Sequence, residues 1–221
     1  MGSTTPLLYW QINIPPSLRE STCPPFLLNL SAKDCSIIST PDELYQVLSW
    51  TQVQQIIKDN RLDAFQRLPS NLRRYLGYIY SIKKSHGSVM NFVLQERLKW
   101  KEPVEAAGKP FEKEEDVKVL WNDWPYGIDE RIVHLVVWTK FELEDDLTTN
   151  DLTDEARGSI EKYVEERFRR RCGDENVVWF KNWRTLKSVH AVEHFHVMLF
   201  DPDPDFVKEV TNGDVPLSRK L

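Results

Sequence analysis

Three of the five histidines of the chain stand close together in the segment Ser188–Phe200. If this segment is a β-strand, its side chains alternate between two faces, so that His190, His194 and His196 share one face. Imidazoles in such positions act as general bases, nucleophiles or metal ligands near neutral pH. The plainer alternative is a set of hydrogen-bonded histidines on a partly buried face. We expect His194 and His196 to act in catalysis, and their replacement to cost little stability.

A fourth histidine, His134, lies within the β-branched and aromatic run Ile132–Lys140. In an extended strand it shares a face with Val136, Trp138 and Lys140. We therefore expect His134 to approach the other imidazoles if the two strands are neighbours in a sheet.

A compact turn, Asn122–Gly127, precedes that run and reads Asn-Asp-Trp-Pro-Tyr-Gly. Proline and glycine beside a polar pair and two aromatic rings favour a rigid turn that presents Asp123 and Tyr126 to a ligand. An ordinary loop held together by its aromatic rings is the alternative. A second polar and aromatic group, Lys181–Arg184, leads into the histidine segment and suits stacking on bases or binding of phosphate.

The sequence offers little support for a metal site. The spacing His194-x-His196 occurs in metal sites on strands, but a metal usually needs a third protein ligand. In a regular strand Glu193 points to the opposite face. The cysteines are odd in number and too widely spaced for a zinc ribbon or a disulfide framework: Cys23, Cys35 and Cys172. We therefore expect neither a metal nor another cofactor.

The composition fits one soluble domain with a well-buried core, since 41% of the 221 residues are hydrophobic. The longest apolar runs are far shorter than the roughly 20 residues of a membrane span. The first residues do not have the pattern of a signal peptide. Together with the scattered cysteines, these features predict a reducing compartment and no membrane attachment, and we expect the cytoplasm.

Charge is unevenly distributed along the chain, whose net charge of −5 argues against indiscriminate binding to nucleic acids. The segment Arg61–Lys101 contains nine lysines and arginines against two acidic residues, and Arg167–Lys187 contains seven against two. The stretch between them, 102–160, is acidic. We predict that the two basic segments form one continuous surface, with ordinary solvated helix faces as the alternative.

The order of expected elements predicts a single domain, 1–221, in three parts. Prolines make 1–39 an extended arm. A helical region, 40–102, begins with a capping pattern at Thr40, and 117–200 contains the sheet and the catalytic site. A helix from about Thr153 to Cys172 separates two pairs of expected strands: Val117–Trp121, Ile132–Lys140, Val177–Phe180 and Ser188–Phe200. This order predicts an α+β fold in which an antiparallel sheet has helices packed on one side.

Several runs of the sequence resemble a fungal family, long catalogued as a domain of unknown function, that includes the N-acetylglucosamine-induced proteins. They are Pro69–Tyr75, Glu96–Trp100, Asn122–Gly127, Val133–Lys140, Trp179–Trp183 and the segment from Ser188 to Val197. The same family includes arginine-containing cyclodipeptide synthases, which join arginine from arginyl-tRNA to a second amino acid and release a cyclic dipeptide. A more distant resemblance is to the histidine-triad superfamily, although Val192 stands where the triad would need a histidine.

The resemblance implies a tRNA-dependent cyclodipeptide synthase of secondary metabolism, with arginyl-tRNA and a second amino acid as partners. Because an aminoacyl ester is already activated, such an enzyme positions two amino acids, relays a proton and stabilises an oxyanion. Asp123 and Glu193 are then the expected acceptors for the arginine guanidinium, and His194 or His196 the general base. Further substrate contacts are expected from Trp124, Tyr126, His134, Trp138, Lys140, Asn182, Arg184 and Ser188.

The basic residues would contact tRNA phosphates in this interpretation: Arg73, Arg74, Lys83, Lys84, Arg169, Arg170 and Lys187. Two alternatives remain. One is a histidine-triad-like nucleotide hydrolase or transferase with His194 as the nucleophile. The other is a non-enzymatic protein that binds a sugar or a nucleotide.

Overall fold

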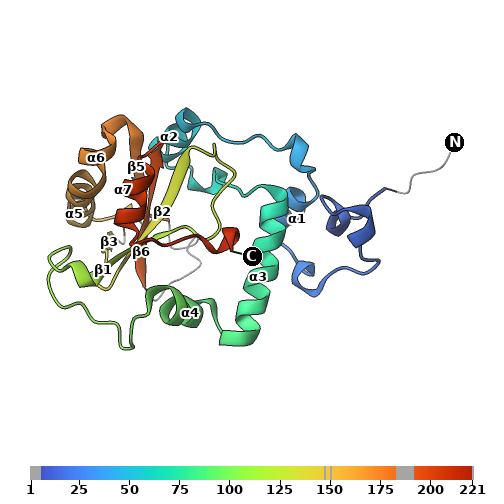
Figure 1. Cartoon of the computed structure of the whole chain (residues 1–221), viewed down its shortest axis with the longest axis horizontal. Coiled ribbons are helices and arrows are strands. Elements are labelled where there is room, and N and C mark those ends of the chain that lie inside the picture. The colour runs from blue at the N-terminus through green and yellow to red at the C-terminus, as the bar shows by residue number, and fades with distance from the viewer. Residues whose placement is uncertain (1–5, 147, 150, 183–191, 221) are drawn as a thin grey trace.

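A four-stranded antiparallel sheet, in the order β1–β2–β6–β5, lies at the centre of the molecule (Figure 1). The structure is a computed structural model that describes residues 6–146, 148–149, 151–182 and 192–220. The strands of the sheet are β1 (Val117–Trp121), β2 (Ile132–Thr139), β5 (Val177–Phe180) and β6 (Glu193–Phe200). A separate two-stranded ladder joins β3 (Asp145–Asp146) to β4 (Asp151–Leu152). The four expected strands are confirmed, with β6 described from Glu193 onward.

The histidine strand is central, as predicted, because β6 lies between β2 and β5. Its register with β2 is regular from end to end and places Trp138 opposite His194, Val136 opposite His196 and His134 opposite Met198. Directly opposed residues of an antiparallel pair share a face. His194 and His196 therefore lie on one face together with the side chains of β2 that alternate from His134.

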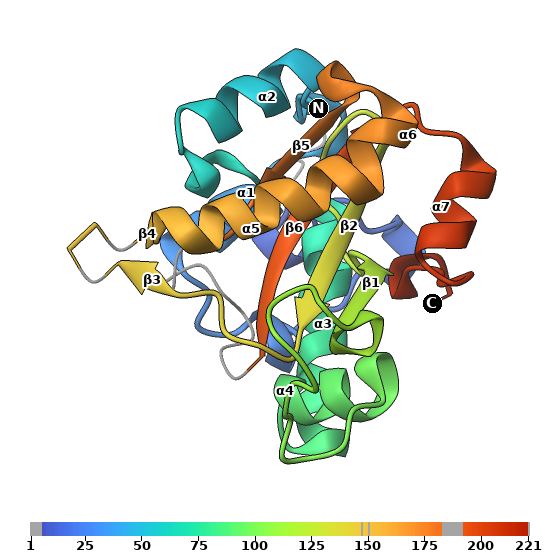
Figure 2. The same ribbon diagram turned by 90° about the vertical axis from the view of Figure 1, so that its left-hand side faces the viewer.

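Helices cover both faces of the sheet, so the expectation of helices on one side is wrong (Figure 2). One face packs against α5 (Asp154–Val164), α6 (Arg170–Cys172) and α7 (Pro204–Val210). The other packs against α2 (Trp50–Lys58), α3 (Pro69–His86) and α4 (Val89–Phe92). The physical reason is that the central strand is apolar on both faces: Phe195, Val197 and Leu199 on one and Met198 on the other are all 0% exposed.

The first part of the chain is less extended than expected. Ser31 caps a short helix, α1 (Ala32–Ile38), whose Ile37 and Ile38 pack against Leu72 of α3. The arm 1–39 was therefore wrongly predicted as extended throughout. Its apolar residues contact α3 and do not reach the sheet.

The capping pattern at Thr40 does not start an α-helix. Only a single 3-10 turn, Asp42–Leu44, follows it, and the side chains of Leu44 and Val47 are 71% and 53% exposed. The α-helix begins later, at Ser49, whose hydroxyl accepts from the Gln52 N–H while the Gln52 side chain accepts from the Ser49 N–H. Apolar side chains without a partner give a helix no packing energy, so the local signal at Thr40 was not sufficient.

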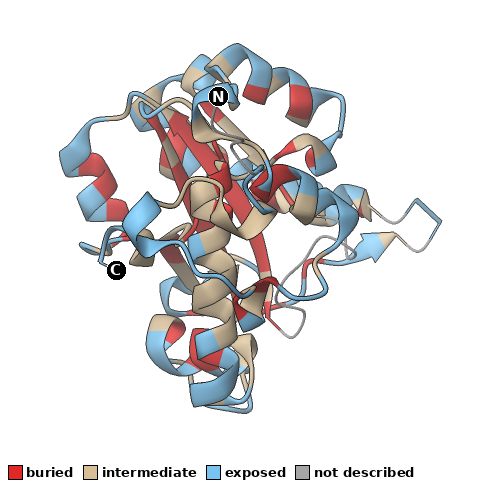
Figure 3. Ribbon diagram, turned by 90° about the vertical axis from the view of Figure 1, so that its right-hand side faces the viewer, coloured by how far each residue is buried: buried red, intermediate tan, exposed pale blue. Residues whose placement is uncertain are grey.

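The 18-residue helix α3 crosses in front of the sheet, and most of its residues are only partly buried (Figure 3). Gly87, with φ of 74°, ends it in the left-handed region that glycine adopts most readily. In the ranges that the structure describes, neither α3 nor any other helix is long and apolar enough to cross a membrane.

Candidate active site

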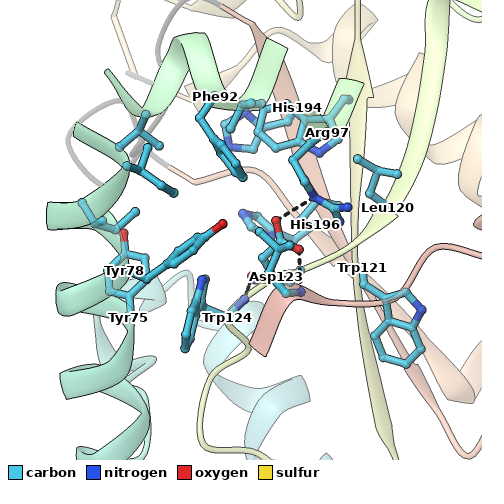
Figure 4. Close-up of a pocket in the computed structure, with 18 of the residues that line it drawn as sticks. Tyr75, Tyr78, Phe92, Arg97, Leu120, Trp121, Asp123, Trp124, His194 and His196 are labelled. Atoms are coloured by element: carbon cyan, nitrogen blue, oxygen red, sulfur yellow. Dashed lines mark hydrogen bonds and ion pairs between the residues drawn. The ribbon is translucent and has the colours of Figure 1, made fainter. Parts of the chain in front are cut away.

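A cavity of about 200 Å³ lies between the α3–α4 side of the sheet and those two helices (Figure 4). Aromatic and aliphatic side chains form most of its wall, and a small number of polar groups face the same space. The described residues that line it are Arg67, Tyr75, Tyr78, Ile79, Ile82, Val89, Phe92, Val93, Arg97, Leu120, Trp121, Asn122, Asp123, Trp124, Tyr126, Val136, Trp138, Asn182, His194, His196 and Leu217. A small apolar pocket with a few convergent polar groups is the usual form of a ligand site.

Two imidazoles from neighbouring strands are hydrogen-bonded to each other beneath this cavity. His134 Nε2 lies 3.0 Å from His196 Nδ1, and His196 Nε2 lies 3.0 Å from the side-chain amide of Asn182. The side-chain amide of Asn122 lies beside the His134 ring, with its Nδ2 3.3 Å from Nδ1 and 3.2 Å from Nε2. The exposed fractions of His134 and His196 are 1% and 6%, so the chain of hydrogen bonds is shielded from water.

Burial keeps both of these imidazoles neutral. It lowers the pKa of His134 to about 3, with the charge of Arg67 acting in the same direction. Burial also lowers the pKa of His196 well below its usual value, aided by His134, His194 and Arg67. Because a neutral imidazole has one N–H and one lone pair, each ring can donate one hydrogen bond and accept one. His196 therefore uses both nitrogens within the protein and is a poor acceptor for a further proton.

His194 has a different environment. Its Nδ1 lies 3.2 Å from the carbonyl oxygen of Val192, which can only accept, so Nδ1 is the protonated nitrogen. Nε2 is therefore the basic atom of the neutral ring. The ring stacks on Trp138 at 4.5 Å between centroids and meets His196 edge-on at 5.7 Å. This packing holds the imidazole in one orientation on the cavity wall.

The turn Asn122–Gly127 was expected to be rigid, and several local contacts hold its conformation. The Asn122 side chain accepts from the Trp124 N–H at 3.1 Å, which is the hydrogen bond of an Asx turn. A Cβ on Gly127 would lie 2.4 Å from the Tyr45 ring, so glycine is required there for space. Tyr126 stacks on Phe65 at 4.8 Å, its hydroxyl is hydrogen-bonded with Asn182, and burial raises its pKa.

Asp123 is bound by an arginine of the protein itself. Its Oδ2 accepts from Arg97 Nε at 2.8 Å, and Arg97 also forms two 2.8 Å hydrogen bonds with Asp214. Asp123 Oδ1 accepts from the Leu217 N–H at 3.0 Å. Burial raises the pKa of Asp123 although these donors act against the shift. The carboxylate of Asp123 therefore fixes residues 214–218 at the edge of the cavity. Both of its oxygen atoms already accept hydrogen bonds from the protein, so they are not free to accept two from a substrate guanidinium.

Arg97 reaches this position from a π-helical turn, Val93–Leu98, that follows α4. The turn ends at Lys99, whose φ of 55° is left-handed. Burial alone would lower the pKa of Arg97, but the hydrogen bonds and charges of Asp214 and Asp123 raise it. Widened turns of this kind often occur at functional sites because they redirect side chains.

Arg67 provides a second cation at the cavity. Its Nε donates to the Trp124 carbonyl at 3.0 Å, and its guanidinium carbon lies 4.1 Å from the centroid of the Tyr75 ring. Tyr126 is the next ring, at 5.7 Å. The guanidinium thus lies against two aromatic faces, an arrangement worth about 0.5–2 kcal/mol per cation–π contact.

The structure brings most of the predicted site residues together. His194, His196, Asp123, Trp124, Tyr126, Trp138 and Asn182 all line the cavity, and His134 lies directly behind it. Arg184 and Ser188 lie outside the described residues. Sequence reasoning missed the roles of Arg67, Arg97, Tyr75, Tyr78 and Asn122, although three of these lie in the runs that resemble the fungal family.

Two predicted site residues do not reach the cavity. Lys140 Nζ lies 3.5 Å from Asp116, and Glu193 Oε2 lies 3.1 Å from Lys181 Nζ. Strand alternation places Glu193 on the face opposite to His194, so it cannot act with that imidazole on one ligand. The expectation that Glu193 and Lys140 contact the substrate is therefore wrong for this cavity.

The basic residues do not form one surface. Arg73, Arg74, Lys83 and Lys84 belong to α3, whereas Arg169 and Arg170 belong to the helical stretch that ends in α6 (Figures 1 and 2). These two stretches pack on opposite faces of the sheet. Arg169 is also paired with Glu161 and Glu165. The prediction of a continuous basic surface is wrong, and Lys187 lies outside the described residues.

No group of three His, Cys, Asp or Glu side chains among the described residues could hold a metal ion. The close imidazoles are those of His134, His194 and His196, and the first and last are hydrogen-bonded to each other. The charged and titratable side chains that line the cavity in the described part of the chain are two imidazoles, two arginines, one carboxylate and three tyrosines.

Comparisons with known proteins give relatives but no activity. The chain is 26% identical over 207 residues to N-acetylglucosamine-induced protein 1 of Candida albicans. The alignment covers 84% of this chain and 82% of that protein. It is 29% identical over 172 residues to the uncharacterized protein YPL067C of Saccharomyces cerevisiae, covering 75% of this chain and 85% of that one. The crystal structure of HTC1 is similar with a TM-score of 0.58 and 26% identity, over 75% of this chain and 94% of that chain. Residues 49–200 match the family model described as a protein of unknown function, DUF3605, and the chain therefore belongs to that family.

Proposed function

We propose that the chain is a tRNA-dependent acyltransferase of the cytoplasm that makes a cyclic dipeptide containing arginine, as part of secondary metabolism. The observation that supports this best is the imidazole of His194, held with Nδ1 protonated on the wall of a small aromatic cavity. The resemblance of the sequence to cyclodipeptide synthases supplies the substrate class. The cavity supplies the groups that such a reaction needs.

The first condensation requires a proton to move between two substrate atoms. The amine of the second amino acid attacks the ester carbonyl of arginyl-tRNA, a C–N bond forms and the C–O bond to the ribose breaks. The amine loses a proton and the ribose oxygen gains one. A base that accepts the first proton and returns it ends the step unchanged. Ring closure repeats this exchange at the carbonyl of the second amino acid, provided that this amino acid also enters as an ester of tRNA. The amine of arginine then attacks that ester, the second amide C–N bond forms, and the second ribose oxygen leaves with the proton.

His194 is better suited to this role than His196. Both rings line the cavity, but His196 is tied through its two nitrogens to the buried side chains of His134 and Asn182. In His194 the contact of Nδ1 with the Val192 carbonyl leaves the lone pair on Nε2. The lowered pKa of His196 also makes it a weak base. We therefore assign proton transfer to His194 and assign His196 to fixing the polar layer beneath the cavity.

Recognition of the arginyl side chain is best placed near Asp123. The group of Arg97, Asp123 and Asp214 contains two carboxylates and one guanidinium, so its formal net charge is −1. Aromatic faces of Tyr78 and Trp124 lie beside it, 5.6 Å apart. Carboxylates with aromatic planes form a suitable site for a guanidinium. A cavity of about 200 Å³ holds one such side chain and leaves the tRNA body outside.

The test is product formation by purified protein supplied with arginyl-tRNA and a mixture of other aminoacyl-tRNAs, read by mass spectrometry of cyclic dipeptides. His194→Gln should lower output by about a hundredfold or more. His86→Gln is the matched control, because His86 is a partly exposed histidine outside the lining of the cavity. Ribonuclease treatment of the wild-type reaction should abolish the product.

Two results would reject this function. Undiminished output from a folded His194→Gln variant would remove His194 as the base. Product that survives ribonuclease would show that the arginine does not come from tRNA. Turnover of a nucleotide without tRNA would instead favour the hydrolase, and tight binding without turnover would favour a binding protein.

A further inference from the structure

The Arg67 end of the cavity has a positive charge without a counter-ion in the chain as described. Within those residues, no carboxylate lies within 4.0 Å of the Arg67 guanidinium, in contrast to Arg97, which is paired with two. Arg67 is partly buried and uses its Nε for the Trp124 carbonyl. The same charge helps to lower the pKa of His134 and His196. Both rings are therefore neutral and do not offset the charge of Arg67. A cation in a partly desolvated cavity attracts an anion.

Trp124, which also lines this cavity, adds a hydrogen-bond donor. Its indole Nε1 is buried and has no hydrogen-bond partner among the described residues, and the whole residue is 5% exposed. Figure 4 shows the indole at the cavity wall, with its nitrogen on the edge toward the enclosed space. A buried donor left without an acceptor costs about 1–3 kcal/mol, so nearly all such donors in native proteins are satisfied. The acceptor that fits here belongs to a ligand.

We propose that Arg67 and the indole N–H of Trp124 form an oxyanion subsite that binds the carboxylate end of a small ligand. The guanidinium supplies charge and N–H donors, and Trp124 supplies a second donor to the same ligand. This subsite does not rest on the proposed cyclodipeptide synthase activity, because it follows from an unpaired cation and an unpaired donor that line one cavity.

The surroundings favour a carboxylate over a phosphate. Among the described residues that line the cavity, Arg67 is the one cation without a carboxylate within 4.0 Å, since Arg97 is already held by Asp123 and Asp214. The carboxylate of Asp123 lines the same cavity and repels additional negative charge. A monoanion therefore fits better than a phosphate dianion. The rings of Tyr75 and Tyr78 suit a flat or aliphatic ligand body.

The experiment measures binding of three probes by isothermal titration calorimetry: 3-phenylpropionate, its neutral amide 3-phenylpropionamide, and inorganic phosphate. We expect the acid to bind at least tenfold more tightly than the amide and than phosphate. Arg67→Gln should weaken binding of the acid at least tenfold, and Arg67→Lys less. Arg73→Gln is the matched control, because this neighbouring arginine donates to the Trp10 carbonyl and does not line the cavity.

A second measurement keeps the test independent of the stability of the variants. In a proton–nitrogen NMR spectrum of the wild-type protein, one indole N–H signal should shift on addition of the acid and not on addition of the amide. The signal belongs to Trp124 if it is missing from Trp124→Phe. The proposal is overturned if the acid and amide bind equally, if a folded Arg67→Gln binds the acid like wild type, or if the Trp124 signal does not move at saturation. Tighter binding of phosphate than of the acid would overturn the choice of a carboxylate.

Discussion

Acidification from pH 7 to pH 5 should destabilise this protein through the buried imidazoles of His134 and His196. Both pKa values are lowered in the folded state, that of His134 to about 3. The unfolded chain takes up a proton on each ring near pH 6.5. The folded state does not, so unfolding binds protons and stability falls as the pH falls. For His134 the loss continues until the pH reaches about 3.

The expected magnitude follows from the same pKa difference. Once the pH is below the pKa of the ring in the unfolded chain, each ring lowers the free energy of unfolding of the protein by about 1.4 kcal/mol per pH unit. Between pH 7 and pH 5 this gives about 2 kcal/mol for each ring and about 4 kcal/mol for the pair. Such a loss is a large part of the 5–15 kcal/mol that typically stabilises a domain. Lowered carboxylate pKa values, as at Asp129, act only at lower pH, whereas the raised pKa of Asp123 acts in the opposite direction and offsets part of the loss as the pH falls.

Urea denaturation followed by tryptophan fluorescence at pH 7, 6 and 5 measures this slope directly. The charged and titratable groups that face His196 are His134, His194 and Arg67. Replacing His134 by Gln removes one ring, so the slope should fall by about 1.4 kcal/mol per pH unit even if the variant is less stable overall. A wild-type free energy of unfolding that changes by less than 1 kcal/mol between pH 7 and pH 5 would refute the argument. It would mean that the native imidazoles accept protons as readily as the unfolded ones.

Three further predictions follow from the packing. Arg97→Ala should lower the free energy of unfolding, measured by urea denaturation, by about 3–5 kcal/mol, because it leaves the mostly buried carboxylates of Asp123 and Asp214 uncompensated. A loss below about 1 kcal/mol would show that these ion pairs are solvated. Gly127→Ala should cost about 1–3 kcal/mol, since its Cβ would lie 2.4 Å from the Tyr45 ring, and the double variant with Tyr45→Ala should not show this clash. Phe195→Ala should lower the free energy of unfolding by about 3–5 kcal/mol, because the ring is 0% exposed. A melting temperature within about 1 °C of the wild-type value would contradict the assigned core.

The strands were predictable because their signal is local. Val117–Trp121, Ile132–Thr139 and Val177–Phe180 are β-branched and aromatic runs bounded by turn residues, and the structure has strands at those positions. Helix positions were less predictable where packing decides. At Thr40 the capping residues are present, but the apolar side chains that follow have no surface to pack against. At Ala32–Ile38, α3 supplies that surface from a distant part of the chain.

The candidate site was predictable in its residues and less so in their environment. Alternation along one strand was enough to place His194 and His196 on one face. It could not show that they are 4% and 6% exposed and hydrogen-bonded. Replacement was expected to cost little stability only for rings that are not buried hydrogen-bonding partners, and these two rings do not meet that condition. It also could not show that Asp123 binds Arg97, because that contact depends on how α4 and the C-terminal residues meet the sheet. Asp123→Asn should therefore affect folding as well as any activity.

The strand order also determines when the cavity can form during synthesis on the ribosome. Arg97 and Asp214, which fix the edge of the cavity, are separated by 117 residues. At about 5–20 residues per second, about 6–23 s pass between the synthesis of one and of the other. During that time β2 has been made but its inner partner β6 has not, so an apolar strand edge is unpaired. The nascent chain should therefore be more prone to aggregation, and more dependent on chaperones, than the finished protein is.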